Sequence, residues 1–242
     1  MPNLLDIQHF SKTYKSSAKR AVDDLSLTVA PGEIHGFIGQ NGAGKTTTIR
    51  AAVGVMDFSE GEIFIDGHSI KKEPVLCKQR LAYVPDNPDL YDYLTGVQYL
   101  SYMADVFRVS DADRKKRIAH YSELLGLSDD LGGLIGGYSH GMKQKLALIG
   151  AFIHAPKLLV LDEPFVGLDP EAAYHLKAMM QSLCDAGGAI FFSTHVLEVA
   201  EKLCHTISII KAGKLVVSGK TDVLRGDKSL ESLFLEVMDH DA

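Results

Sequence analysis

Apolar and polar residues alternate along the first part of the chain. This alternation is typical of strands with one buried face, and it predicts strands at residues 4–10, 25–29, 34–39 and 62–67. The last of these strands ends in Asp-Gly, a dipeptide typical of tight hairpin turns. Short alternating strands that follow one another closely favour an antiparallel sheet.

From residue 81 onward, apolar runs without alternation are separated by segments of helical periodicity. The pattern predicts buried strands at 81–84, 157–164, 187–195 and 206–210, a hairpin at 211–219, and helices at 95–107, 110–125, 146–153, 170–184 and 196–204. Ser110, with Asp113 three residues later, predicts a capping box at the second of these helices. Buried strands that alternate with helices favour a parallel sheet covered on both faces.

These patterns predict a single α/β domain over residues 1–242. Residues 1–85 and 155–225 would form a core that includes the antiparallel strands, and residues 86–154 would form a helical part. Residues 226–242 would form a C-terminal helix and an acidic tail. A chain of 242 residues is long enough to bury one core of this kind.

The composition limits the classes of function. The net charge is −6 at pH 7, whereas proteins that bind nucleic acid backbones concentrate Lys and Arg, so we expect no nucleic acid partner. The longest apolar run, residues 146–153, is much shorter than the about 20 residues of a membrane-spanning helix. Residues 1–10 lack the pattern of a signal peptide. The three cysteines are scattered, which is typical of reduced and buried thiols.

A glycine-rich segment after the strand at 34–39 indicates phosphate binding. It matches the P-loop pattern G-x4-G-K-[ST], in which backbone N–H groups and the start of a helix bind phosphate oxygens. Lys45 would reach the β- and γ-phosphates, Thr46 would bind Mg²⁺ and Thr47 would touch the α-phosphate. A kinase, a GTPase and an ATPase all fit this motif. The expected nucleotide-binding residues are Gly39, Gln40, Asn41, Gly42, Ala43, Gly44, Lys45, Thr46 and Thr47.

Two further strand ends carry residues that suit phosphate chemistry. Asp162 and Glu163 follow a buried apolar run, and His195 ends the next predicted strand. The carboxyl ends of parallel strands lie at the edge where α/β proteins bind ligands. Asp162 would hold Mg²⁺, Glu163 would polarise the attacking water, and His195 would donate a hydrogen bond to the γ-phosphate. The alternatives are an acidic pair that caps a turn and a histidine satisfied at a strand end.

Five motifs, in their order along the chain, resemble the ATPase subunit of ATP-binding cassette (ABC) transporters. They are the P-loop, Y-S-H-G-M-K-Q-K from residue 138, L-L-V-L-D-E-P from 158, G-L-D-P from 167 and S-T-H from 193. The resemblance covers residues 3–235 and includes bacterial exporters of the ABC-2 kind, especially the Ecs-type branch. It implies a P-loop NTPase fold with a RecA-like core, an antiparallel β subdomain and an inserted α-helical subdomain that bears the signature.

In that family two ATPase subunits pair head to tail, and each ATP lies between the P-loop of one and the signature of the other. The resemblance implies that Ser139 and Gly141, within the signature at residues 138–142, contact the γ-phosphate of the partner's ATP. It also implies that Asp169 crosses the dimer interface and that Tyr14 stacks on adenine; the alternative for Tyr14 is an exposed aromatic residue in a turn. The implied cofactors are ATP and Mg²⁺.

The sequence departs from the family pattern at two positions. The usual signature L-S-G-G-Q reads Y-S-H-G-M here, so that His140 replaces a small residue. Asp86 stands where the family usually carries a Gln that senses Mg²⁺. Asp86 would either bind the metal or weaken ATP binding, because like charges about 4 Å apart repel by about 1 kcal/mol in water and by more near a protein surface.

Tyr91, Tyr93 and Leu94 lie in a predicted loop, where a core would not require them. Two interpretations are open. These residues form a small local core, or, as the resemblance implies, they line a groove that receives a short cytoplasmic helix of a membrane subunit.

The sequence therefore predicts an ATP-hydrolysing subunit with Lys45, Glu163 and His195 as its catalytic residues. It would pair with a second ATPase subunit, identical or different, and energise an ABC transporter of the exporter kind by closing on separate integral membrane subunits. Its place would be the cytoplasmic face of the cell membrane. The alternative is a soluble ABC ATPase that drives a cytosolic assembly process such as iron–sulfur scaffold remodelling. A kinase or GTPase would not require the signature.

Overall fold

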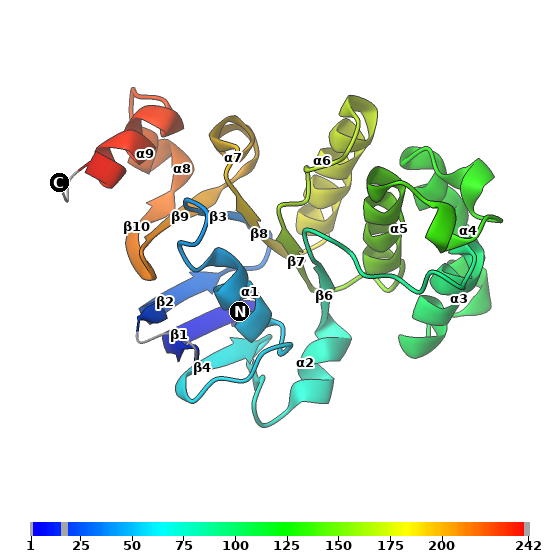
Figure 1. Cartoon of the computed structure of the whole chain (residues 1–242), viewed down its shortest axis with the longest axis horizontal. Helices are drawn as coiled ribbons and strands as arrows, with labels where there is room; N and C mark the ends of the chain where they lie inside the picture. The colour runs from blue at the N-terminus through cyan, green and yellow to red at the C-terminus, as the bar shows by residue number, and fades with distance from the viewer. Residues whose placement is uncertain (1, 16–18, 240–242) are drawn as a thin grey trace.

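The computed structural model describes residues 2–15 and 19–239, which form two sheets and the helices around them (Figure 1). The larger sheet has the strand order β10-β9-β3-β8-β7-β6, and all its neighbours are parallel except β9 and β10. Every residue of β3, β7 and β8 is buried, as the apolar runs of β7 and β8 predict. The prediction of one exposed face for residues 34–39 is wrong, because β3 lies inside the parallel sheet, between β9 and β8. The strands are β3 (Ile34–Ile38), β6 (Leu81–Val84), β7 (Leu158–Asp162), β8 (Ala189–Thr194), β9 (Thr206–Lys211) and β10 (Lys214–Lys220).

The smaller sheet is antiparallel and has the order β2-β1-β4-β5. Its strands are β1 (Leu5–Thr13), β2 (Arg20–Val29), β4 (Glu60–Ile65) and β5 (His68–Ser69). The predicted turn between β4 and β5 is present, since Asp66 and Gly67 both have positive φ, 50° and 81°. Strand β2 begins earlier than predicted because its pairing with β1 is irregular near Asp24 (φ 53°), where the alternation is interrupted.

The helices cover the parallel sheet and extend beyond one end of it. They are α1 (Lys45–Ala52), α2 (Pro74–Arg80), α3 (Gly96–Val106), α4 (Asp111–Leu124), α5 (His140–Ile153), α6 (Pro170–Asp185), α7 (Leu197–Leu203), α8 (Thr221–Arg225) and α9 (Leu230–Asp239). Figure 1 shows α3, α4 and α5 gathered beyond β6, whereas α8 and α9 lie near β10 at the opposite end. The sequence pattern missed α2 and α8, which are too short to show a helical period. The predicted tail beyond Asp239 lies outside the described residues.

The capping box predicted at Ser110 is wrong in part. Ser110 caps α4 by accepting a hydrogen bond from the Asp113 N–H at 3.2 Å, but its hydroxyl also donates to the Asp113 carboxylate. The reciprocal pair that defines a capping box is formed at α3 by Thr95 and Gln98. The Asp side chain is one methylene shorter than the Glu or Gln of the usual motif, which limits its reach back to the cap N–H.

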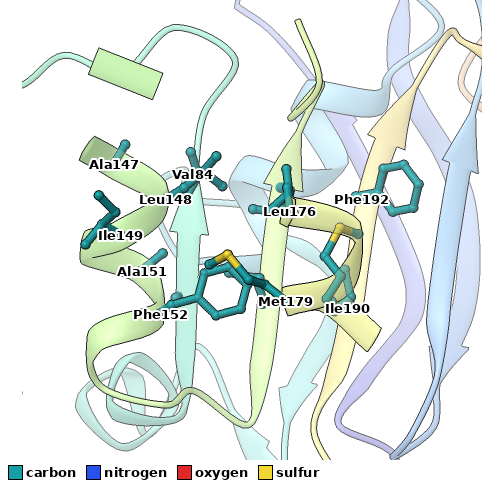
Figure 2. Packing of buried hydrophobic residues seen from close by; sticks show 14 of the residues in the cluster. Val84, Ala147, Leu148, Ile149, Ala151, Phe152, Leu176, Met179, Ile190 and Phe192 are labelled. Carbon is teal, nitrogen blue, oxygen red and sulfur yellow. The ribbon is translucent and has the colours of Figure 1, made fainter. Parts of the chain in front are cut away.

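Two buried apolar clusters fix the helices and the smaller sheet against the parallel sheet. In one cluster, Phe152 of α5 and Met179 of α6 pack over Ile190 and Phe192 of β8 (Figure 2). Full burial of a side chain of this size contributes about 1.5–3 kcal/mol. The second cluster packs the smaller sheet against the other face, where Phe37 and Phe191 are fully buried. The carboxyl ends of the parallel strands are thereby held in fixed positions.

The cysteines agree with the sequence-based prediction. Cys77, Cys184 and Cys204 are free and buried. Burial raises the pKa of all three thiols, and that of Cys184 to about 12, so they are poor nucleophiles. Within residues 2–15 and 19–239, no helix has the length and apolar character needed to span a bilayer.

Candidate functional site

Three loops that are distant in sequence meet at one edge of the parallel sheet. The P-loop follows β3, Glu163 follows β7 and His195 follows β8. In the sheet these strands are neighbours in the order β3-β8-β7, and all run in the same direction. The strand order therefore brings Lys45, Glu163 and His195 together, as the position of a ligand site in α/β sheets requires.

The P-loop needs glycine for steric and conformational reasons. Gly44 has φ of 111°, and a Cβ there would lie 2.6 Å from the carbonyl oxygen of Ala21. A Cβ on Gly39 would lie 2.6 Å from the carbonyl oxygen of Ile210. The loop is thus wedged between two neighbouring segments, and α1 begins directly after it, at Lys45. This is the geometry in which backbone N–H groups and a helix N-terminus face a phosphate.

Lys45 is held against the backbone of the loop. It is 6% exposed, and its Nζ donates to the carbonyl oxygen of Gly39 at 2.7 Å and to that of Gln40 at 3.4 Å. The Nζ also lies 3.7 Å from Oε1 of Glu163. Binding of a triphosphate would exchange these partners for phosphate oxygens, because a buried ammonium group needs hydrogen-bond acceptors.

Glu163 is the point where the contacts of the site converge. Its Oε2 lies 2.9 Å from Nδ1 of His195, while its Oε1 faces Lys45. Its φ of 51° is unusual for a residue with a side chain, and its N–H donates to the carbonyl oxygen and to Oγ of Ser193. Ser193 therefore holds the backbone of Glu163. Beyond its place in the S-T-H motif, Ser193 was not predicted to have a role; its signal is a serine within a strand that is otherwise apolar before Thr194.

Asp162 lies beside Glu163 and is almost fully buried, at 3% exposure. One of its carboxylate oxygens accepts a hydrogen bond from the Ser193 hydroxyl, and the other has no protein partner among the described residues. Burial raises the pKa of Tyr83 to about 12, with further contributions from the carboxylates of Asp162 and Asp86. No sequence motif assigns a role to Tyr83.

The oxygen donors of this edge fit Mg²⁺. The described residues contain no group of three or more His, Cys, Asp or Glu side chains in ligand geometry. Mg²⁺ retains several water molecules and takes one or two protein ligands together with substrate phosphates. Thr46, exposed on the first turn of α1, and Asp162 would suffice, and the exposed Asp86 is a candidate third donor. The ion would supply positive charge to the phosphates.

Tyr14 lies next to the start of α1. Its hydroxyl is 3.1 Å from Oγ1 of Thr47 and 3.4 Å from the Met56 sulfur, and 39% of the residue is exposed. The ring therefore stands beside the P-loop with a free surface, as a stacking partner for a base requires.

The signature segment, residues 138–142, stands apart from the P-loop. Ser139 caps α5 by accepting a hydrogen bond from the Met142 N–H at 3.2 Å, and both Ser139 and His140 are exposed. Figure 1 shows α5 separated from α1 by β6 and β7. In the described part of the chain, no hydrogen bond or ion pair joins residues 138–142 to residues 39–47. One chain therefore does not bring these two segments onto one ligand.

Asp169 has two partners within its own chain. Its Oδ1 accepts a hydrogen bond from the Ala172 N–H at 2.8 Å and caps α6, and its Oδ2 lies 2.6 Å from Nζ of Lys145. The Ala172 N–H and the Lys145 ammonium lower the pKa of this carboxyl. Lys145 is a partner that the sequence analysis did not assign.

The sequence left two interpretations open for residues 91–94, and the burial of these residues differs from one to the next. Leu94 is half-buried against the core, as a local core residue would be. Tyr91 and Tyr93 are exposed and cluster with Tyr102 of α3. The ring centroid of Tyr91 lies 5.9 Å from that of Tyr93 and 5.9 Å from that of Tyr102. A mostly apolar cavity of 350 Å³ lies between Val55, Pro88, Met103 and Phe107, but Tyr91, Tyr93 and Leu94 do not line it.

The chain is similar to known proteins over most of its length. Residues 22–166 match the family model described as ABC transporter. The chain is 33% identical over 245 residues to the ABC-type transporter ATP-binding protein EcsA of Bacillus subtilis, which covers 99% of this chain and 98% of EcsA. It is 34% identical over 220 residues to the ABC transporter ATP-binding protein NatA of the same organism, covering 90% of this chain and 89% of NatA.

Solved structures show the same similarity. One described as the ATP-binding subunit of an ABC transporter has a TM-score of 0.93 and 33% identity, and covers 98% of this chain and 100% of that one. A dimeric ATP-binding cassette in a post-hydrolysis state, bound to ADP and phosphate, has a TM-score of 0.82 at 21% identity, and covers 90% of this chain and 98% of that one. At this identity the second likeness supports the fold only.

Proposed function

Because this chain belongs to the ABC transporter ATP-binding family and is an ATPase subunit of that kind, we propose that it energises an exporter by closing as a dimer on ATP. One observation carries the proposal. The exposed start of α5 offers Ser139 and Gly141, but it stands apart from the P-loop of its own chain. A helix N-terminus with free N–H groups suits a phosphate, and the P-loop that would present this phosphate is that of a second subunit.

The chemistry within each half of the site follows from the contacts. Lys45, Thr46 and the P-loop N–H groups would hold the triphosphate, and Mg²⁺ on Thr46 and Asp162 would neutralise part of its charge. Glu163 would then exchange its contact with Lys45 for the attacking water. His195, which now shares a hydrogen bond with Glu163, would turn its other ring nitrogen to the γ-phosphate.

Residues 86–154 would transmit closure to membrane subunits. The cavity between Val55, Met103 and Phe107 is mostly apolar and lies next to the end of α1. These features suit a short amphipathic helix of a membrane partner, which would place the chain at the cytoplasmic face of the membrane. Movement of this helical part against the core would then shift the transporter between two states. The alternative of a cytosolic assembly ATPase finds no support among the relatives described above.

Co-purification tests the partner. The Glu163→Gln chain, held with ATP and mixed with detergent-solubilised membranes, should retain a polytopic membrane protein in stoichiometric amount. Val55→Asp, which places a charge in the cavity, should abolish this retention. Tyr174→Asp is the matched control, because Tyr174 is as exposed as Val55 (70% against 65%) but lies on α6. Capture of a soluble partner alone would count against the transporter.

Concentration dependence tests the dimer. If two chains share each ATP, the ATPase activity per subunit should rise with protein concentration and level off when the dimer is saturated. A constant specific activity from a chain shown to be monomeric under the same conditions would contradict the shared site.

A further inference from the structure

A contact within one chain joins the signature helix α5 to the loop of residues 163–169. Gly167 has φ of 80°, and a Cβ on it would lie 2.7 Å from Cδ2 of His140. A Cβ on Gly141 would lie 2.6 Å from the carbonyl oxygen of Gly167. The two backbones therefore approach as closely as glycine allows, and the imidazole of His140 lies over Gly167. We refer to this contact, together with the Lys145–Asp169 ion pair, as the latch.

The ion pair adds a directed contact one turn further along the helix. Lys145 follows Gly141 by four residues, so both face the same side of α5. Its Nζ lies 2.6 Å from Oδ2 of Asp169, and its side chain is only 15% exposed. Asp169 keeps its other oxygen on the Ala172 N–H, so the loop is fixed both to α5 and to the start of α6.

The loop itself is short and internally bonded, which suits it to carry a displacement from one end to the other. The Val166 N–H donates to the carbonyl oxygen of Glu163, and the Leu168 N–H donates to that of Phe165. Glu163 thus stands at one end of a compact segment whose other end is held by Lys145. Its backbone is already in a constrained conformation, with φ of 51°.

We infer that His140 and Lys145 are positioning residues, which couple the signature of a chain to the Glu163 of that same chain. The inference rests on the proposed dimer, in which the signature meets the partner's ATP. Engagement of the signature would move α5, and the latch would carry that movement along residues 163–169 to Glu163. His140 gives this chain a contact that a glycine at the same position lacks. The departure from the usual signature is then a functional feature.

A double-mutant cycle tests the coupling. Lys145→Met keeps the apolar stem of the side chain, and Asp169→Asn keeps an acceptor for the Ala172 N–H while removing the charge that binds Lys145. Each variant should lower kcat by about tenfold, which corresponds to about 1.4 kcal/mol, with little change in KM for ATP because the P-loop is untouched. The double variant should be no slower than either single variant. Lys145→Arg should restore most of the activity.

His140→Ala should also lower kcat selectively, since it removes the ring that lies over Gly167.

The matched control for Lys145→Met is Arg225→Met. Arg225 forms an ion pair with Glu201, as Lys145 does with Asp169. Glu201 also accepts a hydrogen bond from the N–H of Leu230, the first residue of α9, much as Asp169 caps α6. This variant should leave kcat unchanged. Denaturant unfolding of each variant checks that the chain is folded under the conditions of the assay.

The outcomes separate the latch from the dimer. ATP-dependent dimerisation is measured for each variant in the Glu163→Gln background by light scattering. If Asp169→Asn lowers kcat while Lys145→Met leaves it at the wild-type value, Asp169 acts across the interface and the proposed coupling through the latch is wrong. Additive losses in the double variant would also overturn it. If the Glu163→Gln chain itself fails to dimerise with ATP, it is the proposed function that fails.

Discussion

At the residue scale, Glu163 carries the largest share of the site's geometry. Its carboxylate touches Lys45 and His195, its N–H is held by Ser193, and its φ is positive. A backbone conformation of this kind persists only where the surroundings fix it. The neighbouring Asp162 is oriented by the same Ser193 hydroxyl. One serine therefore positions both the candidate base and the candidate metal ligand.

Replacement of Glu163 by Gln should separate binding from chemistry. Glutamine keeps the size of the side chain and its hydrogen bond with His195 but cannot accept a proton from water. We expect ATP hydrolysis to fall by about 10²- to 10⁴-fold while ATP binding is retained. Phosphate release and binding of a fluorescent ATP analogue measure the two effects. Glu171→Gln, on the exposed first turn of α6, is the control. Near-normal hydrolysis in Glu163→Gln would remove Glu163 from this role.

Tyr14 offers a test of the nucleotide base. Its ring lies beside Thr47 with a free surface, and stacking of a base on an aromatic ring contributes about 1–3 kcal/mol. Tyr14→Ala should raise the KM for ATP by about tenfold, which is 1.4 kcal/mol. Tyr14→Phe keeps the ring, loses only the hydroxyl contacts with Thr47 and Met56, and should stay close to wild type. Equal KM values for the two variants would show that the ring does not stack.

At the element scale, α5 determines how the helical part meets the core. Its first turn approaches Gly167, its middle packs over the parallel sheet, and Gln144 is completely buried between these regions. Neither Nε2 nor Oε1 of Gln144 has a hydrogen-bond partner among the described residues. Unpaired buried amides are uncommon and costly, and they mark places where function competes with stability.

Gly141 is the tightest point of this helix. Gly141→Ala would force its Cβ against the carbonyl oxygen of Gly167, and such overpacking costs about 1–3 kcal/mol. Gly137→Ala is the matched control, because a Cβ there meets nothing within 4 Å. Chemical denaturation of the two variants measures the difference. If both variants are equally stable, the close approach of α5 to Gly167 is wrong.

Gln144 should be replaceable by an apolar residue of the same length. An unpaired buried amide costs about 1–3 kcal/mol, so Gln144→Met should raise the free energy of unfolding by about 1 kcal/mol and Tm by about 2–4 °C. Calorimetry measures both quantities, with the exposed Gln181→Met as control. A loss of stability would show that the amide has a partner in solution.

At the scale of the whole molecule, ionic contacts join the antiparallel sheet to the parallel core. Asp66 in the β4–β5 turn accepts from Nζ of Lys157 at 2.7 Å and from Nε of Arg80 at 2.9 Å. Burial raises the pKa of this carboxyl, but the two cations outweigh burial, so the pKa lies below its ordinary value of 3.8. The ionised carboxylate therefore stabilises the folded chain.

This contact should give stability a definite pH dependence. Since the folded-state pKa is depressed, the contribution is complete above the ordinary pKa and is lost as pH falls through the folded-state value. Asp66→Asn keeps the turn and should cost about 2 kcal/mol between pH 5 and 7. The difference in the free energy of unfolding between Asp66→Asn and the wild type should shrink below about pH 4. Urea titrations at several pH values measure this; a difference independent of pH would contradict it. The exposed Glu198→Gln is the control.

The sequence by itself determined the fold class and the identity of most candidate residues. Continuous apolar runs at β7 and β8, each bounded by turn residues, favour strands buried on both faces, and the glycine spacing of the P-loop is dictated by phosphate binding. These features can be recognised in the sequence because they are local: burial determines the pattern of apolar residues along a strand, and backbone conformation determines the spacing of glycines in a loop.

The tertiary structure alone decided which residues touch. The order β3-β8-β7 brings Glu163 into contact with both Lys45 and His195. The same packing gives Ser193 its two acidic neighbours and brings Lys145 to Asp169. The partner roles of Ser193 and Lys145 leave no local signal, because each is a polar residue whose position along its strand or helix does not show what it touches. Helix α2 was not predicted for a related reason, since its seven largely exposed residues show no helical period of apolar positions. Spatial proximity across strands depends on sheet order, which no spacing along the chain encodes.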